Sequence, residues 1–316
     1  MISVPSEAVS KKPRSALKGR QVLKHWEYYL MLLPVMAYFA VFRYWPMYGV
    51  QIAFRDYFAT RGILGSDWVG LEHFIRFFNS FHFETIIYNT VVLSLMTTLF
   101  SFPAPIILAL MMNEVRSIKF KRTVQTVTYA PFFISTVVMI GMLQIFLNAR
   151  FGFVNNFLGI FGVEPINFMT DPDWFRPTYV MSIIWQNTGW GSIIYMAALT
   201  SVDPQLIEAA RVDGANRLRI IWHVNLPCIL PTIVILLILN LGSTMNIGFE
   251  RAFLMQNDRN IAVSEIISTF VYRQGLMHMQ FSYAAAVGVF NSIINLMLLF
   301  TVNFAVKRMS PEHSLF

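Results

Sequence analysis

Residues 203–231 read DPQLIEAARVDGANRLRIIWHVNLPCILP, a polar stretch between two hydrophobic runs that are each long enough to cross a bilayer. Asp203 is a favourable N-cap and Pro204 suits the first turn, so a helix is expected to begin there. Gly214 interrupts the helical pattern, which resumes as far as Asn225. The stretch therefore predicts two short helices that are joined at a glycine and lie at a membrane surface.

The composition is that of a membrane protein. Of the 316 residues, 56% are hydrophobic and only 13% are charged, whereas a soluble domain carries about 25% charged residues. The single cysteine, Cys228, excludes an intramolecular disulfide and a Cys-rich metal site. Residues 1–26 are polar and basic and lack the apolar core of a signal peptide, so we expect a cytoplasmic tail there.

Six hydrophobic runs predict an all-α integral membrane protein with six transmembrane helices and a single membrane domain over residues 27–316. The runs lie near 27–50, 86–112, 124–147, 178–201, 228–249 and 282–306. The second run contains Pro103 and Pro105, which predict a kink, and the fourth is unusually polar. Between the first two runs, residues 67–78 have the spacing of an amphipathic interfacial helix.

Positive charge is concentrated on one side of this predicted topology. That side carries 15 of the 24 Lys and Arg residues but only 7 of the 17 Asp and Glu residues. The positive-inside rule places it, with both termini and residues 203–231, in the cytoplasm. The net charge of +7 therefore reflects topology and does not indicate a nucleic-acid partner. The outer loop with Arg251, Glu265 and Arg273 is expected to face water or a partner.

The 203–231 stretch also resembles the EAA loop of ABC importer permeases. The residues that carry the resemblance are Glu208-Ala209-Ala210, Asp213-Gly214-Ala215, Leu226-Pro227 and Pro231. In that family the loop forms a coupling helix that sits in a cleft of a separate ATPase. A loop that only rests on the membrane is the alternative.

The first run, YYLMLLPVMAYFAVFRYWPMYGVQIAF, resembles the oligosaccharide branch of the maltose-transporter-type permeases, which includes alginate importers. The resemblance implies the type I ABC importer permease fold.

The resemblance implies roles for the loop and a set of partners. Glu208 would contact the ATPase, and Leu206, Ile207 and Ala210 would fill its cleft. Asp213 and Gly214 would shape the turn. The coupling residues expected from it are Leu206, Ile207, Glu208, Ala209, Ala210, Asp213 and Gly214. The implied partners are a second homologous permease, an ATP-binding subunit dimer holding ATP and Mg, an extracytoplasmic sugar-binding protein, membrane lipids and the transported oligosaccharide. The implied location is the bacterial cytoplasmic (inner) membrane.

Motifs for catalysis are missing from the sequence. The chain has no GxxxxGK[ST] phosphate loop, no HExxH and no GxSxG, and its six histidines show no metal-ligand spacing. We therefore expect no catalytic residue, no metal and no cofactor in this chain, and a separate subunit that hydrolyses ATP. A polytopic membrane enzyme, such as a lipid-linked glycosyl transferase, is the rival class, but its only acidic candidates, Asp171 and Asp173, lie on the outer side. A homo-oligomeric channel would leave the EAA-like loop unexplained.

Neutral polar residues in the spans suggest a route for a sugar. Amides, hydroxyls and indoles suit the hydroxyl edges and apolar faces of sugar rings, and charged residues that would indicate proton coupling are scarce in the runs. The predicted pathway residues are Trp185, Asn187, Trp190, Tyr195, Asn240, Ser243 and Asn246. Hydrogen bonding between helices in lipid is the alternative role. Nine outer arginines are compatible with an acidic oligosaccharide, but ten acids balance them, so the identity of the sugar stays open.

Overall fold

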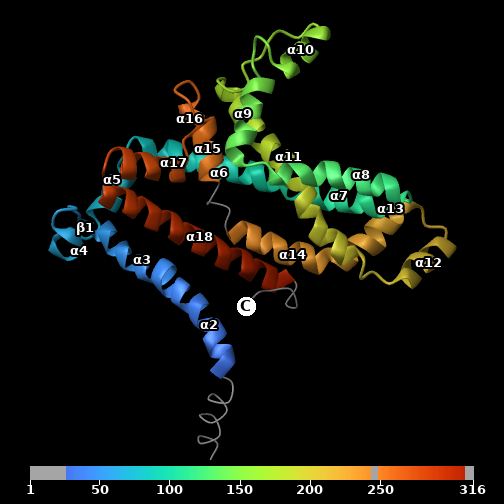
Figure 1. Ribbon diagram of the computed structural model, residues 1–316, viewed down its shortest axis with the longest axis horizontal. Helices are drawn as coiled ribbons and strands as arrows, with labels where there is room; N and C mark the ends of the chain where they lie inside the picture. Colours follow the sequence, from blue (N-terminus) through green and yellow to red (C-terminus); the bar gives the residue numbers. More distant parts are fainter. Residues whose placement is uncertain (1–25, 243–247, 310–316) are drawn as a thin grey trace, which may run out of the picture. The chain divides into compact units, whose positions relative to one another are not determined.

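The computed structural model describes residues 26–242 and 248–309, and this part of the chain is mainly helical (Figure 1). Strands β1 (Arg55–Asp56) and β2 (Asp67–Trp68) pair antiparallel. The chain divides into two compact units, Met1–Ile52 and Ala53–Phe316. The expected tail, residues 1–26, lies almost entirely outside the described residues.

The first predicted span, 27–50, lies within one helix of 29 residues, Trp26–Phe54, which is long and apolar enough to cross a membrane. It consists of α2 (Trp26–Phe39), a π-helical turn η1 (Ala40–Tyr44), α3 (Trp45–Met47) and the 3-10 helix η2 (Tyr48–Phe54). None of the residues of α2 is buried, and Met31 is 75% exposed. Because so much apolar surface is unstable in water, this helix needs lipid or protein around it.

The remaining helices follow in the second unit. They are α4 (Gly62–Gly65), α5 (Glu72–Phe78), α6 (His82–Ser101), α7 (Pro103–Asn113), α8 (Ile118–Tyr129), η3 (Ala130–Phe133), α9 (Thr136–Phe146), α10 (Phe153–Ile160), α11 (Pro172–Leu199), α12 (Pro204–Val212), α13 (Arg217–Ile220), η4 (Ile221–Asn225), α14 (Leu226–Gly242), α15 (Phe249–Met255), α16 (Ile261–Ser264), α17 (Ile267–Tyr272), η5 (Arg273–Met277) and α18 (Phe281–Met309). The interfacial helix is thus shorter than predicted, because Asp67 and Trp68 pair with β1 before α5 begins.

Within the residues that the structure describes, four helices are long and apolar enough to cross a membrane. They are Trp26–Phe54, His82–Asn113, Arg217–Leu241 and Phe281–Phe304. The second changes helix at Phe102, directly before Pro103, where the prolines predicted a kink. The expected third span is not a single straight helix, because its two halves on either side of residues 134 and 135 meet at 105°.

Helix α11 has the length of a span but the polarity of a buried helix. Its 28 residues extend about 42 Å at 1.5 Å per residue, which exceeds the hydrocarbon thickness of a bilayer. It packs against α6, α7, α8 and α14, and residues along its whole length are buried, from Phe175 to Leu199. These neighbours accommodate polar side chains that lipid would not.

A glycine lets α11 approach α8 closely. A Cβ atom added at Gly189 would lie 1.9 Å from the carbonyl oxygen of Thr128 and 2.3 Å from its carbonyl carbon. Small residues allow this kind of backbone contact between membrane helices. The contact fixes the helix that carries most of the predicted pathway residues.

Side chains of α6 hold the segment between α14 and α18 by hydrogen bonds. The Nδ2 atom of Asn89 donates to the carbonyl oxygens of Ala262 (2.8 Å) and Glu265 (3.2 Å), and its Oδ1 accepts from Arg176 (2.9 Å). The hydroxyl of Thr90 accepts from the backbone N–H of Ile267 (3.0 Å). This segment is therefore part of the packed domain.

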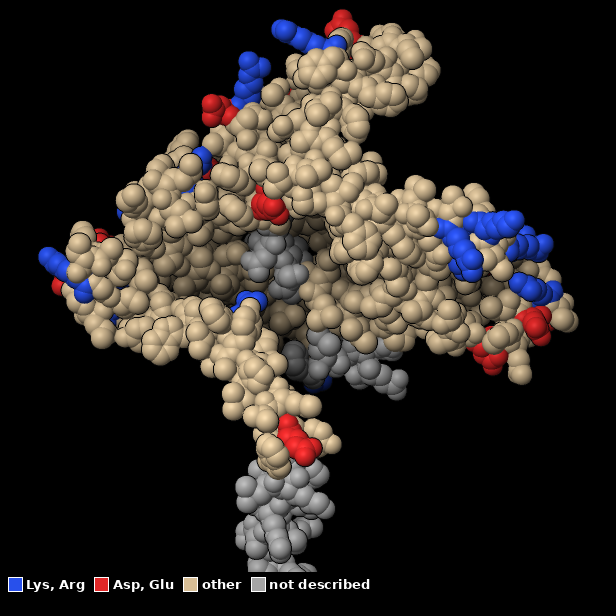
Figure 2. Space-filling model, in the orientation of Figure 1, with Lys and Arg blue, Asp and Glu red and all other residues tan. Residues whose placement is uncertain are grey.

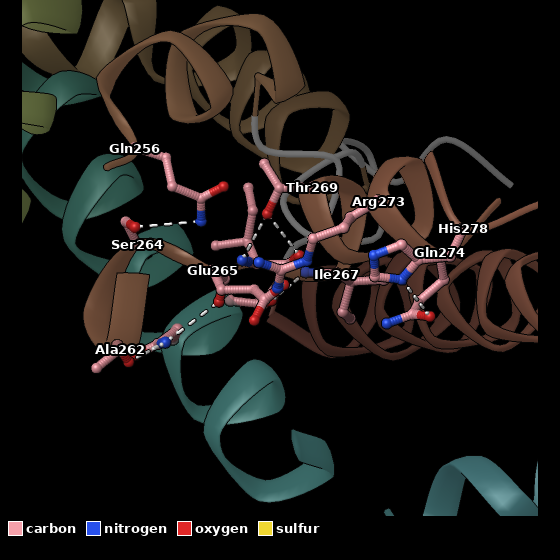
Figure 3. Close-up of polar contacts among 12 residues, drawn as sticks. Gln256, Ala262, Ser264, Glu265, Ile267, Thr269, Arg273, Gln274 and His278 are labelled. Carbon is pink, nitrogen blue, oxygen red and sulfur yellow. Dashed lines mark hydrogen bonds and ion pairs between the residues drawn. The ribbon is translucent and has the colours of Figure 1, made fainter. Parts of the chain in front are cut away.

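The prediction that the charges of this segment face water is wrong for two of them. Arg251 and Glu265 are each only 7% exposed. Figure 3 shows the side chains of Glu265 and Arg273 directed at one another, and the two form an ion pair. Arg251 donates to the hydroxyl of Ser182 (2.7 Å) and to the side-chain oxygen of Gln186, both on α11. Folding the segment against α6 and α11 removes these charges from water.

Replacing Gly189 by alanine tests the close approach of α11 and α8. The added methyl group would collide with the backbone of Thr128, so the free energy of unfolding should fall by about 2–3 kcal/mol. Thermal denaturation of the purified protein in detergent measures this loss. The matched control is Gly141→Ala in the middle of α9, where an added Cβ meets nothing within 4 Å, and its free energy of unfolding should stay the same or rise by up to about 1 kcal/mol, because alanine favours a helix more than glycine does. Equal stability of the two variants would refute the contact.

Candidate functional site: a coupling loop and a polar cavity

The predicted cap begins α12. The carboxylate of Asp203 accepts a hydrogen bond from the backbone N–H of Gln205 (2.9 Å), and Pro204 occupies the first turn. At the other end Gly214 has φ +77°, a conformation that glycine adopts without strain. The backbone N–H of Ala215 donates to the carbonyl oxygen of Ala210 (2.9 Å), and the backbone N–H of Gly214 donates to the carbonyl oxygen of Arg211 (3.1 Å). This is a Schellman motif, and it ends the helix.

The second helix of the loop differs from the prediction. Asn216 caps it through a bond from the N–H of Arg219 (2.9 Å). Helix α13 then continues through the π-helical turn η4 into α14, so Arg217–Leu241 forms one continuous helix. The stretch therefore contains one separate short helix, α12, and the start of a span. Turn η4 precedes Pro227, whose missing N–H removes one regular helical bond.

The coupling residues expected from the resemblance divide into exposed and half-buried positions. Ile207 packs onto a hydrophobic cluster that includes Tyr195, Leu199 and Ile229, so it fixes α12 to the end of α11 and to α14. Ala210 is also half-buried. The exposed members are Leu206, Glu208, Ala209, Asp213 and Gly214, joined by Val212 at 87% exposure. The loop thus presents one short outward surface of mixed apolar and acidic character.

Basic side chains gather at the same end of the helices as α12. Figure 2 shows Lys and Arg over the part of the surface where Figure 1 places α8 and α13. The described residues there include Lys119, Arg122, Arg217 and Arg219, all exposed. This distribution agrees with the positive-inside pattern on which the sequence-based topology relies.

A cavity of about 570 Å³ lies between α6, α7, α11 and α14, and we call it the polar cavity for the amide and hydroxyl groups within its largely apolar lining. Three predicted pathway residues line it, namely Asn187, Tyr195 and Asn240. Thr97 and Ser101 of α6 face the same space, and the hydroxyl oxygen of Thr97 has no hydrogen-bond partner in the described structure. The volume falls within the range of about 300–1,000 Å³ typical of small-molecule sites. The structure thus brings together uncharged polar groups from three helices.

The other predicted pathway residues lie elsewhere or cannot be placed. Trp190 stacks on Phe132, with ring centroids 4.6 Å apart and planes at 5°. Trp185 is 49% exposed and, like Trp190, does not line this cavity. Ser243 and Asn246 lie outside the described residues. No group of three or more His, Cys, Asp or Glu residues in the described ranges could hold a metal ion.

Sequence reasoning missed the contribution of α6 to this cavity. Thr97 and Ser101 are four residues apart and precede the proline break, so they share one face of α6. That spacing was the signal available in the sequence. It could be interpreted only once α6 and α7 were known to pack against α11.

Two named permeases of Bacillus subtilis (strain 168) resemble this chain along most of its length. The polygalacturonan/rhamnogalacturonan transport system permease protein YteP is 48% identical over 284 residues, which cover 90% of this chain and 88% of that protein. The arabinooligosaccharides transport system permease protein AraP is 27% identical over 273 residues, which cover 85% of each chain.

Two solved structures share the fold. A chain of a bacterial ABC transporter involved in the import of the acidic polysaccharide alginate has a TM-score of 0.86 and 40% identity, covering 92% of this chain and 98% of that one. The alginate transporter in complex with an alginate pentasaccharide-bound periplasmic protein matches with a TM-score of 0.85 and 40% identity, covering 92% and 97%. The expected type I ABC importer permease fold is therefore confirmed.

The family assignment comes from the sequence of residues 101–311. They match the family described as "binding-protein-dependent transport system inner membrane component". This match covers more than half of the chain, and the relatives above are named as permeases and not as enzymes. The chain therefore belongs to this family and is a non-enzymatic permease subunit of an ABC importer, located in the inner membrane.

Proposed function

We propose that this permease imports oligosaccharides and that its cargo is acidic, built from uronic acid residues. The observation that carries the proposal is the 48% identity, over 90% of the chain, to a permease named for polygalacturonan and rhamnogalacturonan. The alginate transporter structures, at 40% identity, support the same class. Galacturonan and alginate share a carboxylate on the sugar ring, whereas the relative named for arabinooligosaccharides is more distant.

The proposed assembly contains the subunits that the chain itself lacks. A second, homologous permease completes the membrane domain, and a dimer of ATP-binding subunits binds ATP and Mg. An extracytoplasmic sugar-binding protein delivers the oligosaccharide, consistent with the pentasaccharide-bound periplasmic protein in the related structure. The topology we propose has six spans, with α11 as the polar one, both termini in the cytoplasm and residues 27–316 as one permease domain.

The coupling residues act, in this proposal, through the exposed surface of α12. Leu206, Ala209 and Val212 offer apolar contacts to the ATPase cleft, and Glu208 offers a carboxylate to a basic group there. Half-buried Ile207 and Ala210 transmit movement of α12 to the ends of α11 and α14. Since Arg217–Leu241 is one helix, displacement of α12 reaches the wall of the polar cavity through a single rigid element.

The cavity residues form part of the proposed sugar route. Asn187 and Asn240 lie on α11 and α14, so separation of these two helices would change the cavity that they share. Their amides can exchange hydrogen bonds with sugar hydroxyls, and Tyr195 adds an aromatic face. Roles for Trp185, Trp190, Ser243 and Asn246 in the assembled transporter stay predictions.

Substitutions at Gly214 test the coupling loop. At φ +77° a β-branched residue is strained, whereas asparagine adopts this conformation readily, and an added Cβ meets nothing within 4 Å. Gly214→Val should reduce ATP-dependent uptake about tenfold or more, because strain of about 1–3 kcal/mol reshapes the turn. Gly214→Asn should retain most activity. Uptake is normalised to the amount of inserted permease. Normal uptake by Gly214→Val would contradict the coupling role.

The cargo is tested by uptake into membrane vesicles that contain the whole transporter and its binding protein. We expect saturable, ATP-dependent uptake of a short oligogalacturonide, because a permease that is 48% identical to this chain and an alginate transporter chain that is 40% identical to it are named for acidic polysaccharides. A neutral arabino-oligosaccharide of equal length serves as the comparison. Uptake of the neutral sugar alone would refute the acidic assignment while leaving the permease assignment intact.

A further inference from the structure

A second cavity lies at the opposite end of the long helices from α12. The coupling loop joins the end of α11 to the start of α14, so the segment after α14 and the start of α18 lie on the other side of the membrane. In Figure 1, β1 and α5 lie at the end of α18 that is remote from α12. Residues of β1, α5 and the start of α18 enclose about 350 Å³ here, within the range of small-molecule sites.

The cavity combines aromatic rings with planar polar groups. Its lining includes Tyr57, Phe58, Phe281 and Tyr283, together with Asp56, His73, Arg76 and Gln280. Aromatic faces pack against the apolar C–H faces of sugar rings, and carboxylates and amides bond to the hydroxyls at their edges. This composition differs from that of the 570 Å³ cavity, whose lining residues are all uncharged. The outer cavity is the one that carries ionic groups.

Arg76 is held in a position to bind an anion. Its guanidinium carbon lies 4.5 Å from the centre of the Tyr283 ring, and its NH2 donates to the side-chain oxygen of Gln280 (2.9 Å). Neither Arg76 nor Asp56 takes part in an ion pair within the part of the chain that the structure describes. The remaining N–H groups of an oriented guanidinium match the geometry of a carboxylate.

The backbone around the cavity is fixed by its own contacts. The hydroxyl of Ser282 accepts from the N–H of Tyr57 (2.9 Å), which ties β1 to the start of α18. His73 contacts the carbonyl oxygen of Arg55 (3.1 Å). At the rim Met279 has φ +56°, the only positive φ of a non-glycine residue in the described ranges. Strained residues of this kind occur often at ligand sites.

We propose that this cavity is an outer binding subsite for one uronic acid residue of the transported oligosaccharide. Arg76 binds the ring carboxylate, Asp56 and Gln280 bond to hydroxyls, and the aromatic side chains contact the ring face. The inference rests on the proposed acidic cargo and adds a place where this chain itself distinguishes acidic from neutral sugars. Such a site would hold the oligosaccharide at the entrance before it reaches the polar cavity.

Direct binding tests this subsite without the binding protein. The purified transporter is dialysed against a labelled oligogalacturonide and, separately, against its carboxyl-reduced neutral analogue. Arg76→Gln should weaken binding of the acidic sugar at least tenfold and that of the neutral analogue less than threefold. The matched control is Arg150→Gln, an exposed arginine that does not line the cavity, and it should bind the acidic sugar like the unmodified transporter.

Three results would overturn the subsite. The first is unchanged binding of the acidic sugar by the Arg76→Gln variant, and the second is an equal loss of that binding in the Arg150→Gln variant. The third is a loss of affinity of the Arg76→Gln variant for the sugar-binding protein while sugar binding stays intact, which would identify a protein-docking surface. Uptake by the unmodified transporter is measured in parallel. Normal uptake of the oligogalacturonide together with any of these results refutes the subsite alone, whereas absence of that uptake refutes the proposed cargo.

Discussion

Polar groups that lie at membrane depth must find their partners within the protein, because lipid offers none. This constraint explains why α11 sits at the centre of the domain. Its Ser182 and Gln186 receive the guanidinium of Arg251, and Gln186 in turn donates to the carbonyl of Ile134 (2.7 Å) at the bend before α9. One chain of hydrogen bonds therefore joins α11, the broken helix α8–α9 and the segment after α14.

The same helix connects the two proposed functional sites, the coupling loop and the polar cavity. Its last turn packs with Ile207 of the coupling loop, and its middle carries Asn187 in the polar cavity. Between them Gly189 fixes the distance to α8. Because these positions share one helix, the proposed movement of α12 would also displace the wall of the cavity. In the proposed mechanism the buried polar contacts serve transport as well as stability, since they keep α11 in one piece as it moves.

Local signals in the sequence predicted the local structure well. Asp203 caps α12, Gly214 takes the positive φ that ends it, and the break before Pro103 falls where two prolines predicted a kink. These features depend on a few neighbouring residues, whose conformational preferences act over one turn. The family assignment was also accessible, because the EAA-like pattern is local.

Features that depend on distant contacts could not be predicted. Arg251 and Glu265 are charged residues in a polar segment that the sequence predicted to face water or a partner. Only the fold shows that α6 and α11 bury them. Likewise, Trp190 was predicted to line the sugar pathway, but its ring stacks on Phe132, which is remote in sequence. The sequence predicted a single span over residues 124–147 and did not reveal the 105° bend. Each of these depends on which helices become neighbours, and the pattern of one chain does not contain that information.

The most direct test of the account is the subunit composition of the native complex. The tagged chain is purified from its own membranes in mild detergent, and the copurifying proteins are identified and counted by mass spectrometry. We expect one second permease and two copies of a P-loop ATPase for each copy of this chain. Recovery of the chain alone, under conditions that preserve other membrane complexes, would contradict the assignment of α12 as a coupling helix.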